Sequence, residues 1–228
     1  LKNITERYDG YGNSIRRVME QKNREPGIKG VVADIIHVQK DYEVAIETAL
    51  GGSIQNIVTD NEQTAKRMIG FLKKNRFGRA TFLPLSNISG RGGLNQRDVL
   101  SEPGVVGTAN TLVNADKEYS ELVMYLLGRV LVVDNIDHAI AIGKKYRHSL
   151  RMVTIEGESL SPGGSMTGGA FKNNSNLLGR RREIEELERS VGILRKELEE
   201  TQKSIGENRS RRNVLRDTIA DFQQKLRQ

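Results

Sequence analysis

The sequence contains no cysteine, which excludes a disulfide framework, a thiol nucleophile and a zinc site with cysteine ligands. Such a composition fits a reducing compartment. No apolar run approaches the roughly 20 residues that a membrane-spanning helix needs. The first residues, which begin at Leu1 without a methionine, do not form a signal peptide. They begin in the middle of a pattern, so we expect the chain to be a fragment of a longer protein.

Catalytic motifs are missing as well. There is no P-loop, no G-x-G-x-x-G fingerprint after a strand and no G-x-S-x-G elbow. The three histidines, His37, His138 and His148, lack the spacing of metal ligands. Asp60 and Asp134 occupy equivalent places in two similar segments, and helix capping explains this recurrence better than a catalytic carboxylate pair. We therefore predict no catalytic residue, no metal site and no cofactor.

The charge balance is basic, with 36 Lys and Arg against 29 Asp and Glu, a net charge of +7 and a pI of about 9.6. A basic balance is compatible with a nucleic acid partner. Aromatic residues make up only 5% of the chain, and Phe77 is the one that we single out as a candidate base-stacking platform among the basic residues. Any DNA binding should therefore be weak, sensitive to salt and independent of sequence.

A long helix is predicted from Arg180 to the end of the chain, where glycine is rare and proline absent. Apolar residues recur there at alternating spacings of three and four. One series is Ile184, Val191, Leu198, Ile205, Arg212, Ile219 and Leu226, and the other is Leu187, Leu194, Thr201, Asn208, Leu215 and Phe222. These are the a and d positions of about six heptads, which is typical of a coiled coil. The partner helix is expected upstream, and Leu1, Ile4 and Tyr8 show a remnant of its pattern.

The rest of the chain contains an internal repeat. Residues 27–51 align with residues 104–128 at a constant offset of 77, and Gly27, Tyr42 and Leu50 are among the positions that meet an identical residue. The similarity continues after a shortening of three residues. Each unit reads as strand, helix, buried strand, helix and strand. The pattern predicts two similar α/β (α+β) lobes, joined by the glycine-rich segment 86–93.

A second glycine-rich segment, residues 161–169, is the most unusual local feature. Paired glycines let the backbone approach another surface closely. The segment admits three interpretations: a flexible linker, a phosphate-binding loop, or an edge strand that pairs with another subunit. The phosphate interpretation is weak because no lysine follows in P-loop register.

Several ordered motifs resemble the hinge domains of SMC (structural maintenance of chromosomes) proteins, in a pattern that looks prokaryotic. They are Gly10-Tyr11, Gly27-x-x-Gly30, Tyr42-x-x-Ala45-Ile46-Glu47-x-Ala49-Leu50-Gly51, the stretch Phe77–Leu85, and Pro162–Gly169. The resemblance covers about residues 8–180 and the helix that follows. On this basis the domains are a remnant of an N-terminal coiled-coil arm (1–9), hinge lobe 1 (10–100), hinge lobe 2 (101–177) and a C-terminal coiled-coil arm (178–228).

The resemblance implies a function. SMC proteins are chromosome-organising ATPases, and their ATPase heads lie far from the hinge, so this chain would not itself be an enzyme. The hinge forms a two-fold dimer with itself and contacts DNA without reading sequence. The dimer contact would use Gly163, Gly164, Ser165, Thr167, Gly168 and Gly169. Candidate DNA contacts are Lys73, Lys74, Arg76, Lys144, Lys145, Arg180, Arg181 and Arg182. The expected location is the cytoplasm, at the nucleoid, with no membrane partner.

Two other hypotheses remain open at this point. One is an enzyme or binding domain that takes a nucleotide or metabolite in a cleft between two α/β lobes. The other is a DNA-binding protein that dimerises only through its coiled coil. The oligomeric state of a chain without the coil separates the hinge hypothesis from the second of these.

Overall fold

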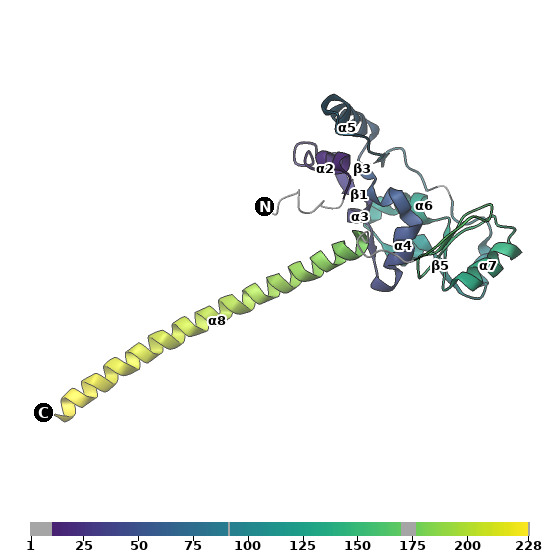
Figure 1. Ribbon diagram of the computed structural model, residues 1–228. Helices are drawn as coiled ribbons and strands as arrows, with labels where there is room; N and C mark the ends of the chain where they lie inside the picture. Colours follow the sequence, from purple (N-terminus) through teal and green to yellow (C-terminus); the bar gives the residue numbers. More distant parts are fainter. Residues whose placement is uncertain (1–10, 91, 170–176, 228) are drawn as a thin grey trace. The chain divides into compact units, whose positions relative to one another are not determined.

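The computed structural model describes residues 11–90, 92–169 and 177–227. Contacts divide the chain into two compact units, residues 1–181 and residues 182–228. All the described strands lie in the first unit (Figure 1). The second unit is the greater part of one helix. Positions 1–10, with the expected remnant of an N-terminal arm at Leu1, Ile4 and Tyr8, lie outside the described residues.

Within each repeat the elements follow the predicted order, and further elements flank the repeats. The first half of the globule contains α2 (Asn13–Met19), β1 (Ile28–Val31), α3 (Val32–Ile35), β2 (His37–Val38), η1 (Lys40–Tyr42), α4 (Glu43–Leu50), η2 (Gly51–Gln55), β3 (Ile57–Thr59), α5 (Glu62–Asn75) and β4 (Phe82–Pro84). The second half contains η3 (Arg97–Ser101), β5 (Val105–Thr108), η4 (Ala109–Leu112), β6 (Val113–Asn114), η5 (Lys117–Tyr119), α6 (Ser120–Leu127), β7 (Val130–Val133), α7 (Ile136–Lys145), β8 (Arg151–Thr154), β9 (Ser159–Leu160) and β10 (Met166–Thr167). The last helix is α8 (Leu177–Leu226).

The two repeats build sheets with the same connections. In the first sheet β1 pairs antiparallel with β3, and β3 pairs parallel with β4. In the second, β5 pairs antiparallel with β7, and β7 pairs parallel with β8. Even the irregularity recurs, because the register shifts after Ile28 in β1 and after Val105 in β5. The predicted mixed α/β fold with two similar lobes is confirmed.

The repeated glycines have the same structural reason in both lobes. A Cβ on Gly27 would lie 2.6 Å from Oδ1 of Asp60, and a Cβ on Gly104 would lie 2.6 Å from Oδ1 of Asp134. The backbone carbonyls of these glycines accept hydrogen bonds from the backbone N–H groups of Asp60 and Asp134, at 2.9 and 2.8 Å. A larger residue at either glycine would therefore disrupt a junction between elements. In the first lobe this junction joins β1 to the start of α5, and in the second it joins β5 to the start of α7.

Helix capping falls on asparagine rather than on the aspartate before it. The side chain of Asn61 accepts hydrogen bonds from the first turn of α5, and that of Asn135 does the same for α7. Asp60 and Asp134 lie against the glycines instead. The predicted cap at each Asp-Asn pair is thus present, but the asparagine provides it and the aspartate does not.

An internal two-fold relation joins the lobes. Strands β2 and β6 pair antiparallel, with His37 opposite Asn114. These two positions are equivalent in the repeat, because they are separated by the same offset of 77. A pair of equivalent residues lies at a symmetry axis, so the lobes are related by a pseudo-two-fold rotation about this pair. Helices α4 and α6, also equivalent, contact one another.

The core is shared between the lobes. One apolar cluster contains Val31 and Ile57 from the first sheet, Ile46 from α4, Leu122 from α6 and Val132 from the second sheet. Along β7 the side chains alternate, as a strand requires: Val130 and Val132 face this cluster, whereas Leu131 and Val133 face a second cluster under α7. The lobes therefore fold as one body.

The heptad residues of α8 lie on its surface, without a partner helix in the described part of the chain. Leu187, Leu194 and Leu198 are each more than half exposed. A continuous a/d stripe of this kind is stable in water only when another helix covers it. None of the described helices is both apolar and long enough to cross a bilayer.

Candidate dimerisation and nucleic-acid interface

Strand β10, in the glycine-rich segment, is the last strand of the five-stranded sheet, whose order is β10-β9-β8-β7-β5. It pairs antiparallel with β9 through Met166 and Thr167. The side chain of Met166 is 52% exposed. A sheet edge with unpaired backbone groups and an exposed apolar side chain can accept a further strand. The structure therefore supports the edge-strand interpretation over that of a linker.

The turn before β10 depends on glycine conformations. Gly163 and Gly164 have φ of +90° and +92°. The backbone N–H of Gly163 donates to the carbonyl of His148 at 2.8 Å, and the N–H of Ser161 donates to the carbonyl of Ser165 at 2.9 Å. A Cβ at Gly163 would meet no atom within 4 Å. This turn thus holds β10 in place and presents bare backbone at the surface.

The glycines after β10 differ from one another. Gly169 has φ of +135°, and a Cβ there would meet no atom within 4 Å, whereas a Cβ on Gly168 would lie 3.0 Å from Cγ of Glu158. Gly168 therefore lets the side chain of Glu158 fold across the sheet. All six residues predicted for the dimer contact therefore lie in β10 or directly beside it.

The first sheet has a matching free edge at β4. In the second lobe the equivalent strand, β8, is covered by β9 and β10, but in the described residues no strand follows β4 on that side. The apolar residues Phe82, Leu85 and Ile88 are only partly buried there. Pro84 lacks an N–H, which limits how far a partner strand can pair along this edge.

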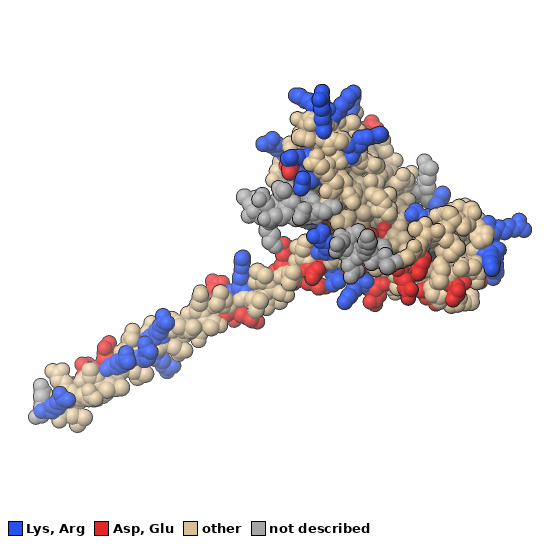
Figure 2. Space-filling model, viewed as in Figure 1, with Lys and Arg blue, Asp and Glu red and all other residues tan. Residues whose placement is uncertain are grey.

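Charge is distributed unevenly between the lobes. Residues 10–100 contain 14 Lys and Arg against nine Asp and Glu, a net charge of +5, whereas residues 101–177 contain seven against eight, a net charge of −1. Unlike lobes therefore attract one another, and like first lobes repel. Figure 2 shows basic side chains gathered over α5 in the first lobe.

The predicted DNA-binding residues of the first lobe are exposed. Lys73 and Lys74 lie in the last turn of α5, and Arg76 caps that helix in the left-handed region, with φ of +55°. Helix α2 packs beside α5, and its Arg17 lies 5.1 Å from the centre of the Phe77 ring. The Phe77 ring thus already contacts Arg17 within the lobe, so it is not a free platform on which a nucleic-acid base could stack.

Other predicted DNA-binding residues are engaged within the chain. Lys145 forms an ion pair with Glu102 at 2.5 Å, and Arg182 forms one with Glu186 at 2.8 Å. Arg181 pairs with Asp34 of α3, and both side chains are mostly buried. Arg180 also has an interaction partner, while Lys144 is exposed. The structure thus brings the first-lobe cations together at one helix end and uses Arg181 to fix the start of α8.

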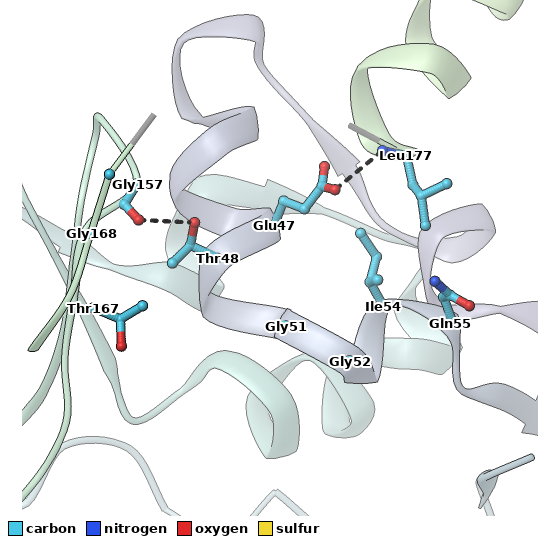
Figure 3. A pocket seen from close by; sticks show the side chains of 11 residues that line it. Glu47, Thr48, Gly51, Gly52, Ile54, Gln55, Gly157, Thr167, Gly168 and Leu177 are labelled. Atoms are coloured by element: carbon cyan, nitrogen blue, oxygen red, sulfur yellow. Dashed lines mark hydrogen bonds between the residues drawn. The ribbon is translucent and has the colours of Figure 1, made fainter. Parts of the chain in front are cut away.

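The start of α8 belongs to the globular unit. Leu177 and Leu178 are 8% and 4% exposed. The backbone N–H of Leu177 donates to Oε1 of Glu47 on α4 at 3.3 Å (Figure 3). Burial raises the pKa of Glu47 to about 7, against an ordinary value of 4.5, although the backbone donors of Leu177 and Leu178 oppose the shift. Glu47 stands in the Tyr42–Gly51 motif, but its contact with Leu177 and that of Asp34 with Arg181 leave no pattern in the sequence, because the partners are 130 and 147 residues away.

Glu47→Gln is expected to stabilise the monomeric chain at pH 8 by up to about 3 kcal/mol. The folded chain binds the Glu47 proton more tightly than the unfolded chain, so this carboxyl lowers stability as pH rises from 4.5 through about 7. Urea unfolding in phosphate buffer, at concentrations where chains are monomeric, measures the difference. It should vanish at pH 4.5, and Glu156→Gln, on an exposed residue, serves as the control. A Glu47→Gln variant no more stable than the parent at pH 8 would contradict the prediction.

Within the described residues, no three His, Cys, Asp or Glu side chains are grouped so as to hold a metal ion. Nδ1 of His138 lies 2.7 Å from Oδ1 of Asp134, and this interaction holds the pKa of Asp134 below its usual value. The pair lies at the start of α7, where it supports the capping turn.

Comparison with known proteins gives concordant matches. The family model described as "SMC proteins Flexible Hinge Domain" matches residues 25–143. The chain is 43% identical to the chromosome partition protein Smc of Bacillus subtilis over 188 residues, which are 81% of this chain and 16% of that protein. It is 39% identical to the protein of the same name from Lactiplantibacillus plantarum over 194 residues, again 16% of the relative.

Two solved structures of SMC hinge domains are also similar to this chain. An asymmetric dimer of the Geobacillus stearothermophilus SMC hinge domain matches with a TM-score of 0.74 and 38% identity, over 83% of this chain and 78% of that one. The Pyrococcus furiosus SMC hinge domain matches with a TM-score of 0.59 and 32% identity, over 73% and 85% of the two chains. The chain spans only about a sixth of the curated relatives, 16% of their length.

Proposed function

Because this chain belongs to the SMC hinge family, we propose that it is the homodimerisation hinge of a chromosome-partition protein, and that it joins two coiled-coil arms. The free edge at β10 carries this proposal. The Geobacillus stearothermophilus relative is described as a dimer of hinge domains. The exposed a/d stripe of α8 fits an arm whose partner helix is supplied elsewhere.

In the proposed dimer, β10 of one chain pairs with β4 of the other. Three observations support this pairing. Strand β4 is the last described strand of the first sheet, whereas its equivalent in the second sheet, β8, pairs with β9 on the corresponding side. Phe82, Leu85 and Ile88 offer apolar surface beside β4. The first lobe carries +5 and the second −1, so contact between unlike lobes is favoured electrostatically. A two-fold axis between the chains repeats this contact, so that β10 of each chain pairs with β4 of the other.

Cysteine cross-linking tests the pairing directly, because the natural chain has no cysteine. A chain that carries Phe82→Cys and Thr167→Cys should form covalent dimers in high yield with a short bis-maleimide. The matched control carries Ile69→Cys and Thr167→Cys, since Ile69 is 52% exposed on α5. Equal yields from the two chains would show that β4 and β10 do not meet.

Sequence-independent DNA contact is the second part of the proposal. It is supported by the positive charge of the first lobe and by the exposed cations at the end of α5. Phosphate contacts of this kind bind any sequence and weaken with salt. The ATPase activity and the nucleoid location that the family implies would belong to the whole protein, of which this chain spans one segment.

A further inference from the structure

The charge of α8 reverses along its length. Residues 183–200 contain three Lys and Arg against seven Asp and Glu, a net charge of −4, whereas residues 201–228 contain seven against three, a net charge of +4. Figure 2 shows basic side chains on the far part of this helix. Both segments belong to one compact unit and share one heptad register. A helix that covers α8 therefore meets two surfaces of opposite sign.

In the far segment, residues 201–228, the cations lie beside the apolar stripe. Five of the seven occupy position a or the positions e and g that flank the stripe: Arg209, Arg211, Arg212, Arg216 and Lys225. Nζ of Lys225 lies 5.9 Å from the centre of the ring of Phe222, a d residue. The outer positions b, c and f carry two cations against three acids. The positive charge is thus directed at the partner that covers the stripe, and not at the opposite face of the helix.

Arg212 occupies an a position, where a covering helix would bury it. Thr201 and Asn208, the other polar residues of the stripe, precede it. The hydroxyl of Thr201 donates to the backbone carbonyl of Glu197 at 2.8 Å, so it needs no further acceptor. Among the described residues, Arg212 takes part in no ion pair. A buried guanidinium without a counter-ion is costly, so we expect the covering surface to present a carboxylate at this level.

A nucleic acid is the other anionic partner for such a surface, and the apolar residues argue against it. Ile205, Leu215 and Ile219 alternate with the cations, and each is about half exposed. A phosphate backbone has no apolar surface with which to cover them, whereas a helix with its own a/d stripe does. The composition of this surface therefore favours a helix with acidic flanks.

A second copy of α8 is a poorer partner, although its residues 183–200 are acidic. The a and d residues of that segment are all apolar: Ile184, Leu187, Val191, Leu194 and Leu198. In an antiparallel pair they would offer no carboxylate within the stripe to Arg212. At the flanking positions of that segment, Arg195 opposes the effect of the glutamates.

We propose that residues 201–226 of α8 are covered by an α-helix whose e and g positions are acidic, and that Arg212 pairs with one of its carboxylates. Arginine forms short, charge-assisted and often bidentate bonds to carboxylates. The charges fix the register as well as the partner, because a helix displaced toward residue 183 would set its acids against Glu188 and Glu197. The inference rests on the proposed function only in taking α8 as one arm of a coiled coil.

Two synthetic helices of four heptads test the proposal on the full chain. Both have isoleucine at a and leucine at d, and one carries glutamate and the other lysine at every e and g position. Copies of the same probe repel one another, so association with α8 is what fluorescence anisotropy measures. The glutamate probe should bind saturably, and its affinity should fall as salt screens the flanking charges. The lysine probe, which suits residues 183–200, controls for the sign of the charge.

Charge reversal locates the binding. Arg209→Glu with Arg216→Glu, both at e positions, should weaken the glutamate probe at least about tenfold and strengthen the lysine probe. The matched control, Lys203→Glu with Arg227→Glu, makes the same change of charge at outer positions and should leave both affinities within about threefold. Circular dichroism checks that the variants keep their helix, and Arg209→Gln with Arg216→Gln replaces the reversal if it does not.

Arg212→Leu tests the pairing within the stripe. It should tighten the lysine probe more than the glutamate probe, because a leucine layer no longer needs a carboxylate. Equal tightening of the two probes would show that Arg212 has no acidic partner.

Several results would overturn the proposal. They are failure of the glutamate probe to bind, or equal effects of the seam reversal and its outer control. Displacement of the glutamate probe by duplex DNA, with DNA binding lost in the same reversal, would identify a nucleic-acid surface instead. Self-association through α8 that this reversal abolishes would identify a second copy. Dimers that persist in the reversal variant leave the proposed hinge intact, whatever the probes show.

Discussion

Replacing Gly163 and Gly164 together by valine is expected to convert the proposed hinge dimer into a folded monomer. Both glycines have φ near +90°, where a β-branched residue is strained, and both lie in the turn that holds β10. The added side chains would also project from backbone that the partner is proposed to approach. We expect the dimer dissociation constant to rise at least 100-fold, or about 2.7 kcal/mol. Sedimentation velocity at micromolar concentration measures the loss.

Two controls separate lost pairing from lost folding. Gly78→Val imposes similar strain, at φ of +95°, in a place where the nearest atom to the new Cβ is 3.8 Å away. Met166→Glu puts a charge on the exposed edge without backbone strain. Circular dichroism should show all variants folded. If Met166→Glu and the double valine variant both remain dimeric, the edge at β10 is not the interface.

The coil must be removed for this measurement, because its exposed a/d stripe can associate by itself. The structure shows where to cut. Truncation just after Asn176 would delete Leu177 and Leu178 from the core and release Asp34 from Arg181. A chain that ends after Arg182 retains these contacts. If this shortened chain is monomeric while the full chain is dimeric, the coil alone drives association and the hinge proposal is wrong.

Reversal of two charges at the end of α5, Lys73→Glu with Arg76→Glu, is expected to weaken binding to duplex DNA at least tenfold at low salt. Both residues are exposed at the end of a helix in the lobe of net charge +5. Each lost phosphate contact should also reduce the slope of log affinity against log salt concentration by about one. Fluorescence anisotropy at several salt concentrations gives both quantities.

The repeat supplies a matched control for this change. Lys144 and Arg147 end α7 as Lys73 and Arg76 end α5, and Arg147 has nearly the same backbone conformation as Arg76, with φ of +53° against +55°. Lys144→Glu with Arg147→Glu changes the same charge in the lobe of net charge −1, and we expect less than a threefold effect. Equal losses from the two pairs would mean that DNA contacts both lobes alike.

Much of the architecture could be predicted from the sequence, because it is encoded locally or by repetition. The heptads predicted α8, the offset of 77 predicted two similar lobes, and the paired glycines allowed an edge strand as one of three interpretations. Strand pairing at β2 and β6 was not foreseen, since two residues per strand leave no periodic signal. It depends instead on symmetry between distant segments.

The long-range polar contacts could not be predicted either. Glu47 belongs to the Tyr42–Gly51 motif, but the motif does not indicate its partner, and only the fold brings the N–H of Leu177 to it. Arg181 reads as part of a basic run suited to DNA, yet it pairs with Asp34 in the globule. Composition shows that cations are present, but which of them remain available to a nucleic acid is decided by tertiary packing.

The unlike edges of the two lobes have a consequence for assembly. A chain that offers β4 at one end and β10 at the other is a bifunctional monomer, in the sense used for polymers. In the proposed dimer its contacts are head-to-tail, and such contacts close into a ring only when the angle between the two ends is right. The pairing of His37 with Asn114 lies at the joint that sets this angle. Alteration of that joint would redirect the same two edges from closed pairs to open filaments.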